Sequence, residues 1–258
     1  MQLPPITTSQ KKIIFFLYKF RFLLICQTQQ FFHHKDSKRV KEWLKDLVNK
    51  KYINVIKDTH DRTKPYVFCL AQQAAHILKE DEDINKTFLY WLYKEKDKSE
   101  VFIQRNLFVV NAYLYFLKNK LKKSELQYFT KQDLTGYTYF PDPLPDAYID
   151  VKEGKEHTRY FLDYFEADMP LGYIRYRVRY YVHYCEEGNW QKNTDNTPFP
   201  ILLLVFDTEK RKRYISHYAQ SLLEKSFTHD VEVFLTSKDN ITFGKENTNI
   251  WQKVEVPD

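Results

Sequence analysis

Apolar residues recur every three or four positions in the first fifty residues, which is the spacing of helices that bury one face. Residues 11–20 and 25–32 predict two such helices, joined by the short link 21–24. A third helix is predicted after the turn at 33–36. Its buried stripe consists of Val40, Trp43, Leu44 and Leu47.

The spacing then changes to the alternation that is typical of strands. Residues 52–56 and 66–70 alternate around the polar loop 57–65, which predicts a two-stranded hairpin. Asp36 or Ser37 is placed to cap the third helix. Three helices followed by such a hairpin predict a winged helix-turn-helix, whose usual partner is duplex DNA.

The rest of the chain mixes both spacings. Helices are predicted at 71–79, 87–94, 101–121, 171–186 and 212–227, and strands at 126–130, 147–151, 160–167, 201–206 and 231–235. We therefore expect an α+β protein of three parts: a winged helix domain at 1–80, a helical connector at 81–123 and a mixed α/β domain at 124–258.

Charge is distributed unevenly along the chain. Residues 1–57 contain 12 Lys and Arg against three Asp and Glu, a net charge of +9, whereas the whole chain carries +6 and the remainder therefore −3. A positive field on the third helix and hairpin suits a phosphate backbone. The expected DNA-binding residues are Lys35, Ser37, Lys38, Arg39, Lys41 and Lys45, with Arg62 and Lys64 in the hairpin loop. The alternative is an ordinary solvated basic surface.

Composition excludes several other classes. Three distant cysteines argue against a disulfide framework and against a zinc cluster, so a reducing cytoplasm is the expected location. The apolar run at 13–26 contains Lys19 and Arg21 and is too short to span a bilayer. No glycine-rich phosphate loop is present, so nucleotide-driven chemistry has no support in the sequence.

Three carboxylates form the main chemical candidate. Asp146 begins one predicted strand, while Glu166 and Asp168 end the next and alternate onto one face of it. If the strands are antiparallel, the three could share Mg²⁺ or Mn²⁺, which prefer oxygen ligands and can activate water for phosphodiester hydrolysis. The alternative is that these acids are solvated residues at strand ends.

Several segments along the chain together carry a family resemblance: Arg21-Phe22-Leu23, Pro65 to Leu70, Asn106 to Asn111, Pro145 to Ile149, Phe161 to Asp168, Arg177 to Tyr181 and Phe199-Pro200. In this order they resemble the replication-relaxation family of plasmid and mobile-element proteins. The resemblance implies a winged helix followed by a domain related to the PD-(D/E)XK restriction-endonuclease-like fold. By this resemblance, Asp146 and Glu166 correspond to the metal ligands of that fold.

The chain departs from active nucleases of that fold at one position. Those enzymes place Lys two residues after the second acid, where this chain has Asp168. A cation on the following helix could substitute, and Arg175, Arg177 and Arg179 are the candidates. Since Arg does not act as a general base at neutral pH, such a residue would only stabilise charge.

The same helix is rich in tyrosine. Its aromatic and basic residues are Tyr173, Tyr176, Arg177, Tyr180, Tyr181 and Tyr184. They could stack on bases and contact phosphates. The alternative, which is the more common role of such tyrosines, is packing against a sheet with the hydroxyls in water.

Three functional hypotheses follow from these patterns. The first is a DNA-binding protein of a plasmid or other mobile element that acts in replication, relaxation or DNA processing. The second is a metal-dependent endonuclease using Asp146, Glu166, Asp168 and Arg177. The third is a scaffold whose degenerate nuclease domain contacts replication or relaxation partner proteins. A tyrosine relaxase is not indicated, because His33 and His34 are adjacent in a turn instead of alternating on a strand.

Overall fold

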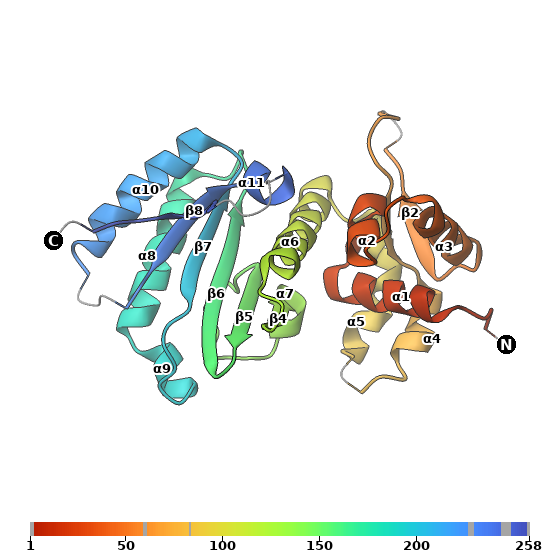
Figure 1. Ribbon diagram of the computed structural model, residues 1–258, viewed down its shortest axis with the longest axis horizontal. Helices are drawn as coiled ribbons and strands as arrows, with labels where there is room; N and C mark the ends of the chain where they lie inside the picture. Colours follow the sequence, from red (N-terminus) through yellow and green to blue (C-terminus); the bar gives the residue numbers. More distant parts are fainter. Residues whose placement is uncertain (1–2, 59–60, 83, 227–229, 244–248, 257–258) are drawn as a thin grey trace. The chain divides into compact units, whose positions relative to one another are not determined.

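The computed structural model describes residues 3–58, 61–82, 84–226, 230–243 and 249–256. Packing divides the chain into two compact units, Met1–Leu114 and Tyr115–Asp258. We call them the N-terminal and C-terminal units (Figure 1). Both are mixtures of helices and β-sheet, as the sequence predicts. The finer division into three parts stays a prediction.

The N-terminal unit begins with alternating helices and strands and continues with short helices. Its elements are α1 (Thr8–Phe20), β1 (Phe22–Leu24), α2 (Ile25–Phe31), α3 (Lys38–Asn49), β2 (Ile53–Ile56), β3 (Val67–Leu70), η1 (Gln72–Ala74), α4 (Ala75–Leu78), α5 (Lys86–Tyr90), η2 (Leu92–Asp97) and α6 (Glu100–Asn119), whose last turn belongs to the C-terminal unit. Figure 1 shows β2 leading into a hairpin that projects beside α3.

A three-stranded antiparallel sheet of order β1-β3-β2 holds this unit together. The segment predicted as a plain link, 21–24, contains strand β1, because Phe22 pairs with Cys69 in the sheet and is completely buried. Phe22 and Cys69 pack against Ile103 and Leu107 of α6. Pairing with a distant strand therefore gives this short segment an extended conformation that its local pattern does not indicate.

Arg21 ends α1 in a left-handed conformation, with φ of 69°. Its backbone N–H donates to the carbonyl of Leu17 at 2.8 Å. Its guanidinium binds the buried carboxylate of Glu95 from η2, with Nε 2.9 Å from Oε2. One residue of the link therefore connects the end of α1 to a segment more than seventy positions later.

The C-terminal unit is built on a six-stranded sheet of order β4-β5-β6-β7-β8-β9. Its strands are β4 (Glu125–Thr130), β5 (Ala147–Glu153), β6 (Glu156–Phe165), β7 (Ile201–Phe206), β8 (Val233–Ser237) and β9 (Gln252–Lys253), and its helices are α7 (Lys131–Leu134), α8 (Leu171–Glu186), α9 (Asn189–Asn193), α10 (Glu209–Leu223) and α11 (Lys238–Phe243). The first three strands are antiparallel neighbours, whereas β6, β7 and β8 run parallel.

Helices α8 and α10 connect the parallel strands β6, β7 and β8 in turn, and they pack against each other. Successive right-handed crossovers between neighbouring parallel strands place their helices on the same face of a sheet, and Figure 1 shows α8 and α10 side by side along it. Their buried sides meet a core that includes Phe161, Ile174 and Trp190. The predicted order of strands and helices in this unit is confirmed, with α7, α9, α11 and β9 as additions.

Cys26, Cys69 and Cys185 are all free thiols. Burial raises the pKa of Cys69 to about 12, so this thiol stays protonated at neutral pH. Across the described residues, no helix combines the length and the apolar character that crossing a lipid bilayer requires.

Candidate functional site

Helix α3 presents one buried and one basic side. Val40, Leu44 and Leu47 are at most 1% exposed, and Trp43 is half-buried. Lys38, Lys41 and Lys45 are all exposed. In a helix with 3.6 residues per turn these three lysines lie on one face, opposite the buried residues. No ion pair within the described ranges involves any of the three, so their charges face solvent.

The other residues predicted to bind DNA surround this face. Asp36 accepts a hydrogen bond from the backbone N–H of Lys38 at 2.8 Å, while the side chain of the N-cap residue Ser37 makes no capping bond. Lys35 is exposed. Arg39 lies over the ring of Trp43 at 5.6 Å, which holds its guanidinium on the flank of α3.

In the hairpin loop, Arg62 is exposed. Lys64 pairs with Asp58 at 2.8 Å, and its pKa is raised chiefly by the hydrogen bond to that carboxylate. Residues 59–60 of the predicted loop lie outside the described residues.

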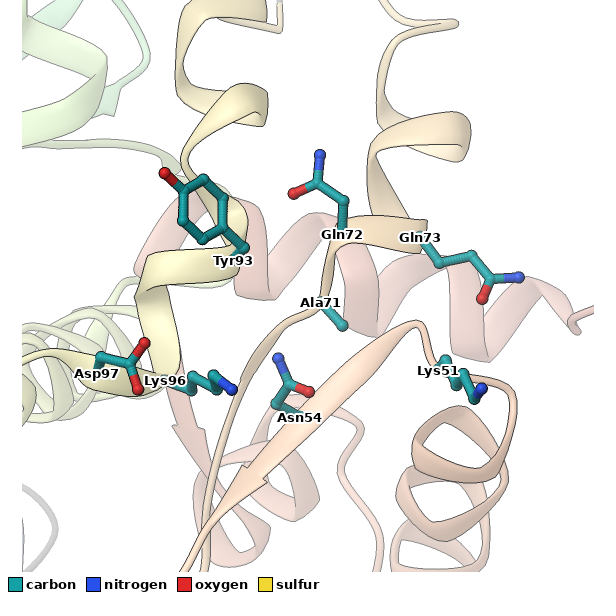
Figure 2. A pocket seen from close by; sticks show the side chains of 8 residues that line it. All are labelled: Lys51, Asn54, Ala71, Gln72, Gln73, Tyr93, Lys96 and Asp97. Carbon is teal, nitrogen blue, oxygen red and sulfur yellow. The ribbon is translucent and has the colours of Figure 1, made fainter.

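An open pocket of about 510 Å³ lies beyond the C-terminal end of α3. It is lined by Lys51, Asn54, Ala71, Gln72, Gln73, Tyr93, Lys96 and Asp97. Figure 2 shows Lys51 and Gln73 on one side of it and Tyr93, Lys96 and Asp97 on the other. None of the residues predicted to act in function lines this pocket. Its lining mixes Lys and Asp side chains and indicates no particular ligand.

In the C-terminal unit, Asp146 lies directly before β5 and is 3% exposed. Its Oδ1 accepts a hydrogen bond from Lys131 Nζ at 2.8 Å, and its Oδ2 accepts one from the backbone N–H of Tyr164 at 2.8 Å. Its own backbone N–H donates to Leu162 O at 2.8 Å and approaches Asp163 Oδ1 at 3.2 Å. Asp146 is thus bonded both to the neighbouring strand β6 and to α7.

Asp163 is the carboxylate that sequence reasoning missed. It lies within β6 and is 5% exposed. Its Oδ2 accepts hydrogen bonds from Arg177 Nε at 2.6 Å and from the hydroxyl of Tyr181 at 2.9 Å. Arg177 also donates to the carbonyl of Pro143 and to the Tyr181 hydroxyl. Two carboxylates and two cations, Asp146 with Lys131 and Asp163 with Arg177, form what we call the paired-charge cluster.

The charges in this cluster reinforce one another. Burial lowers the pKa of Arg177, but the nearby Asp163, Tyr181 and Asp146 more than offset burial, and the net pKa is raised. The guanidinium therefore keeps its charge. Burial raises the pKa of Tyr181 well above its usual value, so the phenol stays neutral and can donate to Asp163.

The predicted trio of acids is not brought together. Strand β6 ends at Phe165, so Glu166 and Asp168 lie in the following turn and the strand alternation does not extend to them. Asp168 is exposed and Glu166 is half-buried. The described ranges contain no group of three His, Cys, Asp or Glu side chains able to hold a metal ion. The strand alternation on which the predicted site of Asp146, Glu166 and Asp168 rests is therefore absent at the last two residues.

The residues present do not fit Mg²⁺ or Mn²⁺ in this arrangement. Both oxygens of Asp146 and both of Asp163 lie within hydrogen-bonding distance of protein donors. A divalent cation at these oxygens would also meet the ammonium of Lys131 and the guanidinium of Arg177, whose positive charges repel it. The positive charges of Lys131 and Arg177 instead balance the two carboxylates.

The predicted cationic helix is α8, and its arginines are dispersed. Only Arg177 is directed at the carboxylates. Arg175 contacts the hydroxyl of Tyr214 at 3.3 Å, and Arg179 is exposed. The tyrosines of α8 divide between the two roles considered from sequence: Tyr181 and Tyr184 are buried, whereas Tyr173 and Tyr176 are exposed.

Comparison with known proteins identifies a family and two solved structures that this chain resembles. The model of the replication-relaxation family matches residues 15–199. No curated protein matches the chain in sequence. Two solved structures match over most of its length. They are restriction endonuclease FokI (13% identity, TM-score 0.36, 94% of this chain and 46% of that one) and FokI bound to DNA (13% identity, TM-score 0.32, 92% of this chain and 44% of that one).

The chain thus spans less than half the length of FokI, and TM-scores this low do not establish a common fold. The family match is different in kind, because it covers well over half of the chain and includes both α3 and the paired-charge cluster. The protein belongs to the replication-relaxation family.

Proposed function

We propose that the protein binds duplex DNA of a mobile element and acts there in replication or relaxation, with α3 of a winged helix in the major groove. The order α1, β1, α2, α3, β2, β3 supports the winged helix. The observation that carries the proposal is the exposed lysine face of α3, opposite the residues that anchor the helix. Sequence preference would come from base contacts made by this helix.

The hairpin between β2 and β3 supports the same mode of binding. Arg62 would contact the DNA backbone directly, because its side chain is exposed. Lys64 would first have to leave Asp58, to which it is bonded at 2.8 Å. We therefore expect Arg62 to contribute more to DNA affinity than Lys64 does.

Reversing two charges on α3 tests the proposal. In the variant K38E/K41E, duplex affinity is expected to fall at least about tenfold at low salt, and the slope of log Kd against log salt concentration to flatten by about two. The loss follows because fewer counterions are released on binding. Fluorescence anisotropy with duplexes from the DNA flanking the encoding gene measures both quantities.

The matched control is K79E/K86E, which changes the net charge by the same amount at exposed positions of the same unit. Equal losses in both variants would show that only overall charge matters. Unchanged binding in K38E/K41E would refute α3 as the DNA-binding helix.

We further propose that the C-terminal unit serves as a scaffold for partner proteins and does not cleave DNA. The paired-charge cluster supports the absence of cleavage, because its carboxylates are bonded to Lys131 and Arg177. Incubation of supercoiled DNA with the protein and Mg²⁺ or Mn²⁺ should therefore give no more nicked circles than a protein-free control. Nicking by the native chain that disappears in D146N, D163N or E166A, while the circular dichroism stays native, would establish a metal-dependent endonuclease instead.

A further inference from the structure

The outer face of α8 and α10 carries tyrosine rings that are not buried in the core. Tyr173, Tyr176 and Tyr214 are 44%, 47% and 43% exposed. A group of exposed rings rimmed by polar residues is typical of an interaction surface, whereas single exposed rings are ordinary. None of these residues contributes to the paired-charge cluster or to α3.

One of these rings, that of Tyr176, is the exposed end of a row of three tyrosine rings along α8, which we call the tyrosine ladder. Tyr176 stacks on Tyr180 with ring centroids 6.2 Å apart, and Tyr180 lies 6.1 Å from Tyr184. The ladder is anchored because Tyr184 donates to the carbonyl of Tyr139, and Tyr180 accepts from the backbone N–H of Asp142 at 3.2 Å. Tyr180 therefore supports one side of the Tyr176 ring, which lowers the side-chain entropy that a planar ligand stacking on Tyr176 would cost.

Cations surround the exposed rings. Residues 171–183 of α8 contain three arginines and no acid, and Glu186 ends that helix. Helix α10 begins at Glu209 and continues with the run Lys210-Arg211-Lys212-Arg213, in which Lys212 pairs with Glu209 at 2.8 Å. Arg175 joins the two helices, because it contacts the Tyr214 hydroxyl at 3.3 Å and lies 5.8 Å over the ring of Tyr218. Arg179 and Arg213 are exposed, and no ion pair engages either within the described part of the chain.

The two helices also enclose a shallow groove of about 480 Å³. From α8 it is lined by Tyr176, Arg179, Tyr180, Val182, His183 and Glu186, and from the end of α10 and beyond by Leu222, Lys225 and Ser226. The carboxylate of Glu186 lies 3.8 Å from the imidazole of His183. The exposed rings, the arginines and the groove therefore all lie on α8 and α10.

We propose that this α8–α10 face binds single-stranded DNA. Bases stack on the open rings of Tyr176 and Tyr214, while Arg175, Arg179 and Arg213 contact the phosphates. A duplex does not satisfy this surface, because its bases are already stacked on one another and expose only their edges. A protein interface is also enriched in Tyr and Arg, but its centre is depleted of charge, whereas here Arg175, Arg179 and Arg213 lie among the exposed rings. The face is separate from the lysine face of α3 and takes a different form of DNA.

Removing the rings tests the stacking. Binding of a fluorescent oligothymidine of about 12 nucleotides, a length within the range of known single-strand sites, is measured by anisotropy. The variant Y176A/Y214A is expected to bind at least about tenfold more weakly than the native chain. The control Y90A/Y137A removes two other exposed rings, 74% and 53% exposed, and should bind as the native chain does.

Two further comparisons separate base stacking from simple attraction to a polyanion. A strand of the same length without bases should bind at least about tenfold more weakly than oligothymidine. Equal affinity for both strands, or native affinity in Y176A/Y214A, would overturn the proposal.

Measuring both pairs of charge-reversal variants with both forms of DNA separates this proposal from duplex binding by α3. R179E/R213E is expected to lose affinity for oligothymidine at least about tenfold and to bind duplex as before, whereas K38E/K41E should do the reverse. If R179E/R213E leaves oligothymidine binding unchanged, the α8–α10 face is not the site, whatever the result for α3.

Discussion

Replacing Arg177 with methionine is expected to lower the free energy of unfolding of the C-terminal unit by about 3–5 kcal/mol. The reason is that Arg177 is 2% exposed and bonded to Asp163, which is 5% exposed. Without the guanidinium, Asp163 keeps a buried charge with the phenol of Tyr181 as its remaining side-chain donor. Hydrogen exchange of peptides from β5, β6 and β7, measured with increasing urea, reports this unit separately from the other.

A second, exposed ion pair of the same unit provides the control. Lys253 and Glu232 lie 2.7 Å apart with side chains 41% and 43% exposed, so K253M should cost no more than about 1 kcal/mol. The double variant D163L/R177M should recover part of the loss, because it removes both charges together. A cost for R177M as small as that for K253M would show that water reaches the paired-charge cluster.

Replacing Arg21 with methionine is expected to lower the free energy of unfolding of the N-terminal unit by about 3–5 kcal/mol. Its guanidinium binds both oxygens of Glu95, at 2.9 and 2.5 Å, and Glu95 is 1% exposed. The guanidinium also lies 4.5 Å from the ring of Phe102 and 5.4 Å from that of Phe88. Hydrogen exchange of peptides from β1 and β3 measures the effect.

Two variants locate the cause of that loss. R21K keeps the charge but not the planar fork that contacts both oxygens and the rings, so its cost should fall between those of R21M and the native chain. K50M breaks the pair Lys50–Asp46, which spans 2.7 Å at the surface of the same unit, and should cost no more than about 1 kcal/mol. If R21M is as mild as K50M, Glu95 must find another partner or take up a proton.

Much of the fold could be predicted because its signals are local. The stripe of α3 with its basic opposite side, strand 201–206 and helix 171–186 all appear where the spacing of apolar residues places them. Each of these elements is long enough for its period to repeat. Strands β1 and β9, with three and two residues, are too short to show a period and exist through pairing with β3 and β8.

The candidate site in the C-terminal unit was only partly predictable. Asp146 was found because a proline and an acid begin a strand. Asp163 was missed because the predicted strand 160–167 extended two residues too far and directed attention to Glu166 and Asp168. The register that pairs Ala147 with Leu162 determines which acid faces Asp146, and register depends on contacts between strands.

The amino-acid sequence by itself determined the positive charge of residues 1–57, the helical face that carries much of it, and the order of strands and helices that follows. Those properties depend on neighbours a few positions apart. Only the tertiary structure decided that Arg177 bonds to Asp163, Lys131 to Asp146 and Arg21 to Glu95. Such pairs form between residues 14 to 74 positions apart, and burial of the three carboxylates limits the water that would otherwise compete for them.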